Sequence, residues 1–338
     1  MTKDGASQQH NNKAASISTN VDTLSTTMNN ISISNSKDSV LNNAECGKEA
    51  EISSNKKVST SCVQNVDHKN DIGTREQHTT NNGGTSDTAD KNFISDDDLF
   101  KVPPPKEDCP ICMQPIPYEN GICGVTRVYQ PCCGKLLCGG CVVAAQIEMH
   151  KGNMKRLCPF CRVPIQRSDK EMMKRIKKRL KVNDTEAFFT LGMKYHYGKM
   201  GLAQDANKAW ELMNRSAELG SVRARYNIAV AFHSGDGVEK NTSKAVHHYK
   251  LAAIGGHERA RLWLGIIEMS NGHINYAMKH FMIAAKSGLD EALKEVGKGY
   301  KAGHVTKDEY AMTLRAHKDS QDEMKSEKRT KSAKFLVE

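Results

Sequence analysis

The stretch AFFTLGMKYHYGKMGLAQDANKAWELMNRSAELG, residues 187–220, decides how most of this chain folds. It opens with Ala187, four residues before the pair Leu191-Gly192, and it closes on Gly220. Small residues at fixed places allow two helices to cross closely, and a glycine directly after a helix adopts the left-handed C-terminal cap. The stretch therefore predicts two short helices packed as a hairpin.

The landmarks of this stretch return three times further along the chain. Each later unit begins with an alanine, and the second and third units also end in Ala-Ala-x-x-Gly. Repeats with periods near this length are typical of solenoids built from helical hairpins. We therefore expect a mostly α chain with an α/α helical-repeat solenoid over residues 184–315. The leading alanines are Ala187, Ala224, Ala260 and Ala292, at steps of 37, 36 and 32 residues.

The repeated pattern AxxxLGxxYxxG followed by KAxxWxxxAAxxG resembles the Sel-1-like repeat, a relative of the tetratricopeptide repeat. The first unit has Tyr195, Gly198 and Trp210 in place, whereas the third has Glu268 where the aromatic residue belongs. The fourth unit lacks the closing Ala-Ala-x-x-Gly and resembles a terminal cap. This resemblance implies a solenoid that does no chemistry and binds a protein substrate or adaptor through exposed side chains. The patterned aromatics and alanines are expected in its core.

Upstream of the repeats, nine of the eleven cysteines fall between Cys109 and Cys161. Six of them form three Cys-x-x-Cys pairs, and two more are adjacent in the chain. A Cys-x-x-Cys turn places two thiolates close enough to share one tetrahedral zinc ion. One such pair could be a redox site, but three within so short a segment favour zinc. The pairs are Cys109/Cys112, Cys138/Cys141 and Cys158/Cys161, and the adjacent cysteines are Cys132 and Cys133.

The segment from residue 105 to 166 resembles a RING-type zinc finger. DCPICMQP is similar to the opening of that family and CPFCR to its close. In RING domains, the ligand pairs alternate between two zinc ions in a cross-brace, and metal binding supplies much of the folding free energy. The resemblance therefore implies two zinc ions. Cys109, Cys112, Cys138 and Cys141 would hold the first ion, and Cys132, Cys133, Cys158 and Cys161 would hold the second.

The middle of this segment departs from most RING domains. They place one to three residues between the third and fourth ligands, and the fourth ligand is often histidine. If Cys133 is aligned as the third ligand, the histidine position falls on Lys135, whose ammonium cannot bind zinc. The Cys132/Cys133 pair instead matches an all-cysteine variant of the family. Cys123 remains an alternative to either residue, and His150 is a weaker candidate because it falls in a predicted helix.

The RING resemblance implies ubiquitin-protein ligase activity. Such ligases form no covalent intermediate. They bind a conjugating enzyme charged with ubiquitin and hold its thioester in an attack-ready pose, which is catalysis by positioning. In the family, residues at the positions of Ile111, Pro159 and Arg162 contact the conjugating enzyme or ubiquitin. Ala145 stands where many ligases carry a bulky tryptophan. This departure supports the alternative interpretation, a non-enzymatic zinc-dependent scaffold for protein–protein interaction.

The charge of the chain is unevenly distributed. Residues 1–100 contain 9 Lys+Arg and 14 Asp+Glu and are rich in Ser, Thr and Asn, so we expect a disordered tail. The formal charge of the whole chain is +10, and residues 101–338 therefore carry +15. Part of that excess lies in a predicted basic connecting helix over residues 167–183, capped by Ser168. A charged tail is expected over residues 316–338.

The basic excess raises a third functional hypothesis, a zinc protein associated with nucleic acid, which would bind in a strongly salt-dependent manner. No aromatic pattern typical of RNA binding accompanies the basic run, so this hypothesis ranks last. The first residues contain no hydrophobic segment, and no apolar run reaches the roughly 20 residues that a membrane span needs. We therefore expect no membrane span and an intracellular location, cytoplasmic or nuclear, where cysteines stay reduced.

Overall fold

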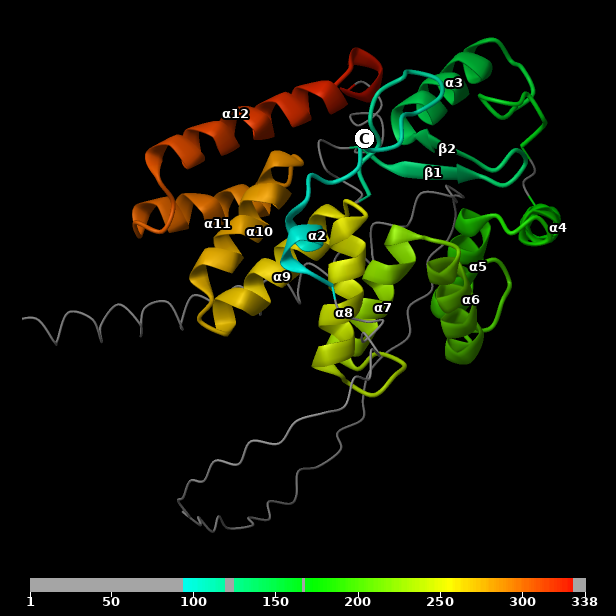
Figure 1. Ribbon diagram of the computed structural model, residues 1–338. Helices are drawn as coiled ribbons and strands as arrows, with labels where there is room; N and C mark the ends of the chain where they lie inside the picture. Colours follow the sequence, from blue (N-terminus) through cyan, green and yellow to red (C-terminus); the bar gives the residue numbers. More distant parts are fainter. Residues whose placement is uncertain (1–93, 119–124, 166–167, 331–338) are drawn as a thin grey trace, which may run out of the picture. The chain divides into compact units, whose positions relative to one another are not determined.

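The computed structural model describes residues 94–118, 125–165 and 168–330. Helices predominate in these residues, so the predicted fold class, a mostly α chain with a helical-repeat solenoid, is confirmed (Figure 1). The disordered tail was expected over residues 1–100, and residues 1–93 of it lie outside the described residues. Within the described residues, no helix combines the length and the apolar character that crossing a membrane requires.

Eight helices form four consecutive hairpins in the second half of the chain. In each hairpin the two helices pack against each other, and each hairpin also packs against the next one (Figure 1). This arrangement follows the predicted repeat units in order. The pairs are α5 (Thr185–Tyr197) with α6 (Ala206–Glu218), α7 (Val222–Ser234) with α8 (Thr242–Ile254), α9 (Glu258–Ser270) with α10 (Ile274–Lys286), and α11 (Asp290–Lys301) with α12 (Lys307–Met324).

Local sequence signals mark where these helices begin and end. Asp184, Asp205 and Ser221 each precede a helix, and their side chains accept a backbone N–H from its first turn. Such caps satisfy donors that the helix itself leaves unpaired. Gly220 and Gly256 follow the second helix of a unit with φ of 94° and 91°, a conformation that residues with a Cβ rarely adopt.

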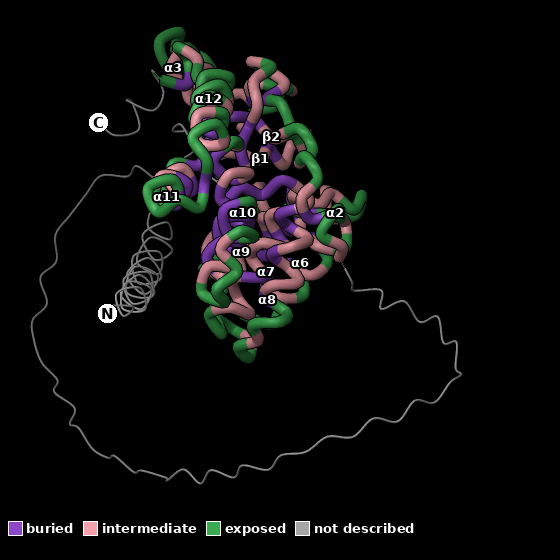
Figure 2. The backbone as a smooth tube through the Cα atoms, turned by 60° about the vertical axis from the view of Figure 1, so that its left-hand side comes forward, coloured by how far each residue is buried: buried purple, intermediate pink, exposed green. Residues whose placement is uncertain are grey.

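The core of the repeats is built around the patterned small residues. The four leading alanines are fully buried, and the buried residues form a continuous band through the hairpins (Figure 2). Trp210 packs edge-on against Phe232, with ring centroids 5.3 Å apart. The pattern's alanines therefore let the helices approach, while its aromatic residues fill the space between neighbouring units.

The cysteine-rich segment folds as a small β-hairpin followed by a helix. Strands β1 (Arg127–Gln130) and β2 (Lys135–Cys138) pair antiparallel, with Arg127 opposite Cys138. Helix α3 (Gly139–Lys151) follows directly and packs against both strands. Isolated bridges, Asp108 with Pro115 and Leu157 with Pro164, close two further loops. So small a segment has little apolar core of its own.

The basic connecting helix is α4 (Asp169–Leu180), and its Ser168 cap accepts a hydrogen bond from the backbone N–H of Glu171. Ile176 on this helix is buried in a cluster with the first repeat helix. Asp184, the cap of α5, accepts hydrogen bonds from Arg179 Nε at 2.7 Å and from the Tyr129 hydroxyl at 2.9 Å. Strand β1, α4 and the first repeat therefore meet at one carboxylate.

The structure differs from the predicted boundaries at both ends of the described chain. Helix α2 (Asp96–Phe100) lies within the predicted tail, and α12 continues to Met324 inside the predicted charged tail. Buried side chains explain both differences, because Leu99 of α2 is 3% exposed and Met324 at the end of α12 is 1% exposed. Each of these polar segments therefore carries side chains that another part of the fold covers.

Candidate metal centres

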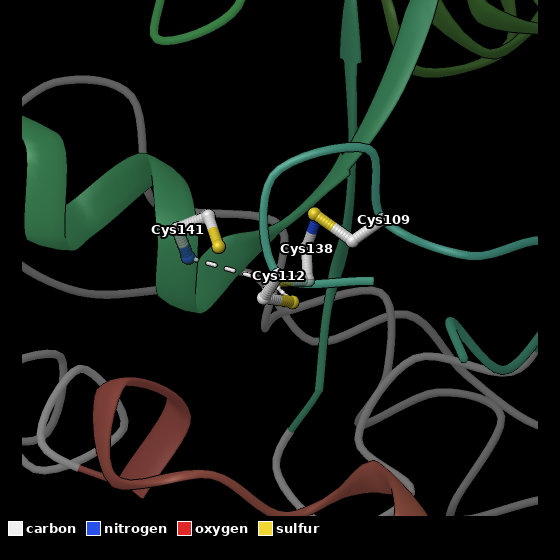
Figure 3. A group of neighbouring side chains, drawn as sticks. All are labelled: Cys109, Cys112, Cys138 and Cys141. Carbon is white, nitrogen blue, oxygen red and sulfur yellow. Dashed lines mark hydrogen bonds between the residues drawn. The ribbon is translucent and has the colours of Figure 1, made fainter. Parts of the chain in front are cut away.

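Four sulfur atoms gather where the first loop, the end of β2 and the start of α3 meet (Figure 3). Cys138 ends β2 and caps α3, and the backbone N–H of Cys141 donates to its sulfur at 3.4 Å. The Cys112 and Cys138 sulfurs lie 3.8 Å apart. All four atoms lie within 4.8 Å of one another, a spacing that lets one ion contact each of them. This first centre contains Cys109, Cys112, Cys138 and Cys141.

A second group of four sulfurs forms between the β1–β2 turn and the last Cys-x-x-Cys loop. Cys132 and Cys133 are adjacent in that turn, yet both sulfurs belong to the group. Backbone N–H groups of Cys133 and Gly134 both donate to Gln130, which tightens the turn. The Cys132 and Cys161 sulfurs lie 3.4 Å apart. This second centre contains Cys132, Cys133, Cys158 and Cys161.

One Cys-x-x-Cys loop in each centre has the same backbone conformation: Cys109–Cys112 in the first and Cys158–Cys161 in the second. In the first, Met113 N–H donates to the Cys109 carbonyl at 2.8 Å, and in the second, Arg162 N–H donates to the Cys158 carbonyl at 3.0 Å. Met113 and Arg162 both have positive φ, at 54° and 62°. A non-glycine residue in this region costs free energy, so the same strained turn in both loops indicates a shape kept to aim paired sulfurs.

Burial affects the protonation of the clustered thiols. Burial raises the pKa of Cys133 to about 11 and the pKa of Cys141 to about 12, because a site with little water disfavours the charged thiolate, and neighbouring cysteines raise both values further. A divalent ion reverses this balance by stabilising the thiolates, and binding releases their protons. Four cysteine sulfurs within 4.8 Å of one another suit zinc, so both centres could hold a metal ion of that type.

The alternatives to this ligand set are placed as follows. Cys123 lies outside the described residues. His150 is exposed on α3 and belongs to neither sulfur group. The eight cysteines expected to bind zinc are thus brought together in the expected alternation, while their role as ligands stays a prediction.

The residues expected to dock a conjugating enzyme lie on the loops that carry the sulfurs. Ile111 is 37% exposed, Pro159 is half-buried and Arg162 is exposed. Sequence reasoning missed two neighbours, Met113 at 70% and Phe160 at 41% exposure. Met113 follows a Cys-x-x-Cys pair and Phe160 lies inside one. The sequence signal was their size, because so small a domain has no core large enough to bury such apolar side chains.

Arg329 is a third residue that the sequence did not reveal. Its guanidinium Nη2 donates to the Cys112 sulfur at 3.5 Å and to the Gln114 carbonyl at 3.0 Å. Its Nη1 donates to the Pro115 carbonyl at 2.9 Å. A side chain 217 residues along the chain therefore closes the first centre from outside.

Comparison with known proteins identifies the repeats. A family model described as Sel1 repeat matches residues 189–221 and 222–257, the segment from α5 to α8. Residues 189–257 contain two Sel1 repeats. No RING family model matches it. The two matched Sel1 repeats are the units that carry the predicted pattern most fully, and the hairpins α9–α10 and α11–α12 continue the same architecture.

Two curated relatives share sequence with part of the chain. "Chitin synthase regulatory factor 3" of Schizosaccharomyces pombe is 40% identical over 68 residues, which is 20% of this chain and 7% of the relative. "Chitin synthase regulatory factor 2" of the same organism is 31% identical over 83 residues, 25% of this chain and 16% of the relative. The matches thus span only a small part of either relative.

Solved structures with Sel1 repeats are also similar to this chain. A Sel1 repeat protein from Oxalobacter formigenes is 25% identical with a TM-score of 0.41, over 46% of this chain and 66% of that one. A protective antigen of uropathogenic Escherichia coli strains is 26% identical with a TM-score of 0.38, over 45% of this chain and 33% of that one.

Proposed function

We propose that this protein is a zinc-dependent RING-type ubiquitin ligase whose Sel1 repeats recruit a protein substrate or adaptor. The observation that carries the proposal is the alternation of the two sulfur groups along the chain. The first and third cysteine pairs gather in one centre, and the second and fourth pairs gather in the other. This interleaving is the cross-brace that the RING resemblance implies.

The surface of the two sulfur loops supports the same proposal. Ile111 and Phe160 are exposed apolar side chains inside Cys-x-x-Cys pairs, and a small zinc domain without a partner would gain nothing from leaving both in water. Arg162 follows the last cysteine and is exposed. Its planar guanidinium can donate to two partners at once, which suits a residue that bridges ubiquitin and a conjugating enzyme.

The chemistry required of this chain is positioning. The conjugating enzyme supplies the thioester and the substrate supplies the amine. The ligase therefore needs a rigid apolar contact, a fixed cation and a second site that holds the substrate nearby. We assign the contact to Ile111 and Pro159, the cation to Arg162 and the second site to the Sel1 repeats.

Self-ubiquitination of the full chain with a panel of conjugating enzymes tests the proposal. Ile111→Ala should abolish chain formation and keep both zinc ions, because its side chain is partly exposed beside the first centre rather than bound to metal. Arg162→Ala should reduce chain formation about tenfold or more while preserving docking. Met154→Ala, which removes a 58% exposed apolar side chain from the same segment, is the matched control and should keep full activity.

A non-enzymatic zinc-dependent scaffold is the second candidate. Ala145, half-buried on α3, favours it because the bulky contact of many ligases is missing there. The curated relatives of the Sel1 repeats carry the name of regulatory factors, which is also compatible with a scaffold. Absence of ubiquitin chains with every conjugating enzyme, from a folded protein that contains two zinc ions, would favour the scaffold over the ligase.

A further inference from the structure

The segment that leads into the first sulfur loop lies against the Sel1 repeats. Residues 94–107, here called the strap, contain the five-residue helix α2, which contacts α8 (Figure 1). At its other end, Lys106 Nζ donates to the Ser287 carbonyl at 2.8 Å and lies 3.6 Å from the buried Glu258 carboxylate. The strap therefore covers part of the surface formed by α8, α9 and α10.

Phe100 is the main aromatic contact between the strap and the repeats. Its ring centroid lies 4.8 Å from that of His280 and 5.8 Å from that of Tyr276. Lys279 Nζ lies 5.3 Å from the Phe100 ring centre, a cation–π distance. The neighbouring Leu99 is buried. Two consecutive apolar side chains thus supply the adhesion.

One acidic residue of α2, Asp96, contacts the repeats, and cationic side chains lie in the same surface. The Tyr276 hydroxyl donates to the Asp96 carboxylate at 2.6 Å. Beneath Phe100, His280 is fully buried and lies 3.5 Å from Arg261, which is 1% exposed. Within the described part of the chain, Arg261 Nε and Nη2 have no hydrogen-bond partner. A buried guanidinium left partly unpaired is costly, and Arg261 adds positive charge beneath the surface that the strap covers.

Few contacts hold the strap on this surface, and it does not cover the surface completely. A helix of five residues is not stable by itself in water, so its order depends on these contacts. An open groove of about 620 Å³ remains between the strap and the end of α8, lined by Asp98, Val102 and Ile254 among others. Val102 is 92% exposed. The strap therefore leaves part of the surface unfilled.

We propose that this surface of α8–α10 is a binding site for short helical peptides in which an acidic residue stands three residues before Leu-Phe, as Asp96 does, and that the strap occupies it in cis. A tethered occupant has an effective concentration on the order of millimolar, so weak intrinsic affinity suffices to keep it in place. A partner with the same chemistry must displace it. This inference does not depend on ligase activity.

A peptide of residues 94–102 with a fluorescent label provides the probe. Fluorescence anisotropy should show that it binds the full-length Leu99→Ala/Phe100→Ala chain about tenfold or more tightly than the wild type, because the variant's own strap no longer competes. Adding Lys279→Glu to that variant should reverse the gain. Lys301→Glu, a charge reversal of an exposed lysine on α11, should leave it unchanged. The peptide with Phe100→Ala should not bind.

Hydrogen exchange on the wild-type chain gives a second readout that requires no strap variant. A saturating excess of the unlabelled peptide should speed amide exchange in residues 96–101, and Lys279→Glu alone should do the same. If the double variant retains zinc and native tryptophan emission yet binds no better than wild type, the proposal fails. If amide exchange in residues 96–101 changes neither with the peptide nor in Lys279→Glu, the proposal also fails and the strap is only a connecting segment.

Discussion

At the scale of single residues, Arg329 shows how a distant side chain can tune a metal centre. Four thiolates around one divalent ion carry a net negative charge, and the guanidinium that donates to the Cys112 sulfur offsets part of it. Outer partners of this kind commonly contribute about 10–100-fold to metal affinity. We therefore expect Arg329→Ala to lower the affinity of the first centre for zinc by that factor and to leave the affinity of the second centre unchanged. Competition with a chromogenic chelator measures both affinities.

The control for this prediction is Lys325→Ala, which removes a neighbouring cation that contacts only the exposed carboxylate of Asp322. It should change neither zinc affinity nor stability noticeably, because exposed ion pairs contribute little. Arg329→Lys should recover part of the loss, since it restores the charge without the fork of donors. Equal zinc affinity in wild type and Arg329→Ala would show that the contact is mere packing.

The sequence predicted the cysteines of both centres but not Arg329, for a physical reason. Paired cysteines can be recognised from their spacing in the sequence, because a turn of fixed length directs two sulfurs toward one ion. Arg329 acts across the fold, and nothing in the basic residues around it distinguishes it from exposed neighbours. Only tertiary packing shows that it is 4% exposed.

At the scale of helices, two glycines at the same repeat position differ in what surrounds them. A Cβ placed on Gly265 of α9 would lie 2.5 Å from the Phe281 ring, whereas one on Gly297 of α11 would meet only the Tyr310 hydroxyl, at 3.5 Å. Gly265→Ala should therefore lower the free energy of unfolding by about 1–3 kcal/mol. Gly297→Ala should be neutral or stabilise by up to about 1 kcal/mol.

Chemical denaturation followed by tryptophan emission measures both variants. The pair is informative because the repeat pattern treats the two glycines as equivalent, and the sequence predicted only that small residues permit close crossing. How close two helices come depends on the side chain opposite, which the pattern does not specify. A similar loss in both variants would mean that glycine flexibility, and not the contact with Phe281, sets the cost.

Helix boundaries show the same division between local and long-range information. Capping residues such as Ser168 and Asp205 predict where α4 and α6 begin, because their side chains satisfy the first turn. Helix α2 was not predictable, since Asp-Asp-Asp-Leu-Phe resembles the acidic segment before it in sequence. Its order comes from the rings of Tyr276 and His280, about 180 residues away.

At the scale of the whole molecule, the chain offers a way to separate its two folded regions. Both tryptophans, Trp210 and Trp263, lie in the helical repeats, and all described cysteines lie in the two candidate metal centres. Removal of zinc by a strong chelator should expose all eight thiols to a thiol reagent while tryptophan emission stays native. The melting temperature of the repeats should fall by a few degrees as contacts such as Tyr129 with Asp184 are lost. Emission typical of unfolded protein would instead show that the repeats need zinc to fold.

Buried histidine makes the repeats sensitive to acid. Burial, with Arg261 and Lys250 nearby, lowers the pKa of His280 to about 3, below the roughly 6.5 expected in the unfolded chain. The unfolded state therefore binds the proton more readily, so stability is full above pH 6.5 and declines as pH falls toward 3. At pH 5, His280 alone should lower the free energy of unfolding by about 1–2 kcal/mol relative to pH 7.

His280→Gln should flatten the pH profile of the free energy of unfolding by that amount, and the exposed His304→Gln should leave the profile unchanged. Because neither histidine belongs to a sulfur group, loss of zinc in acid affects all three proteins alike and cancels in the comparison. Parallel profiles for wild type and His280→Gln would place the acid sensitivity elsewhere in the molecule.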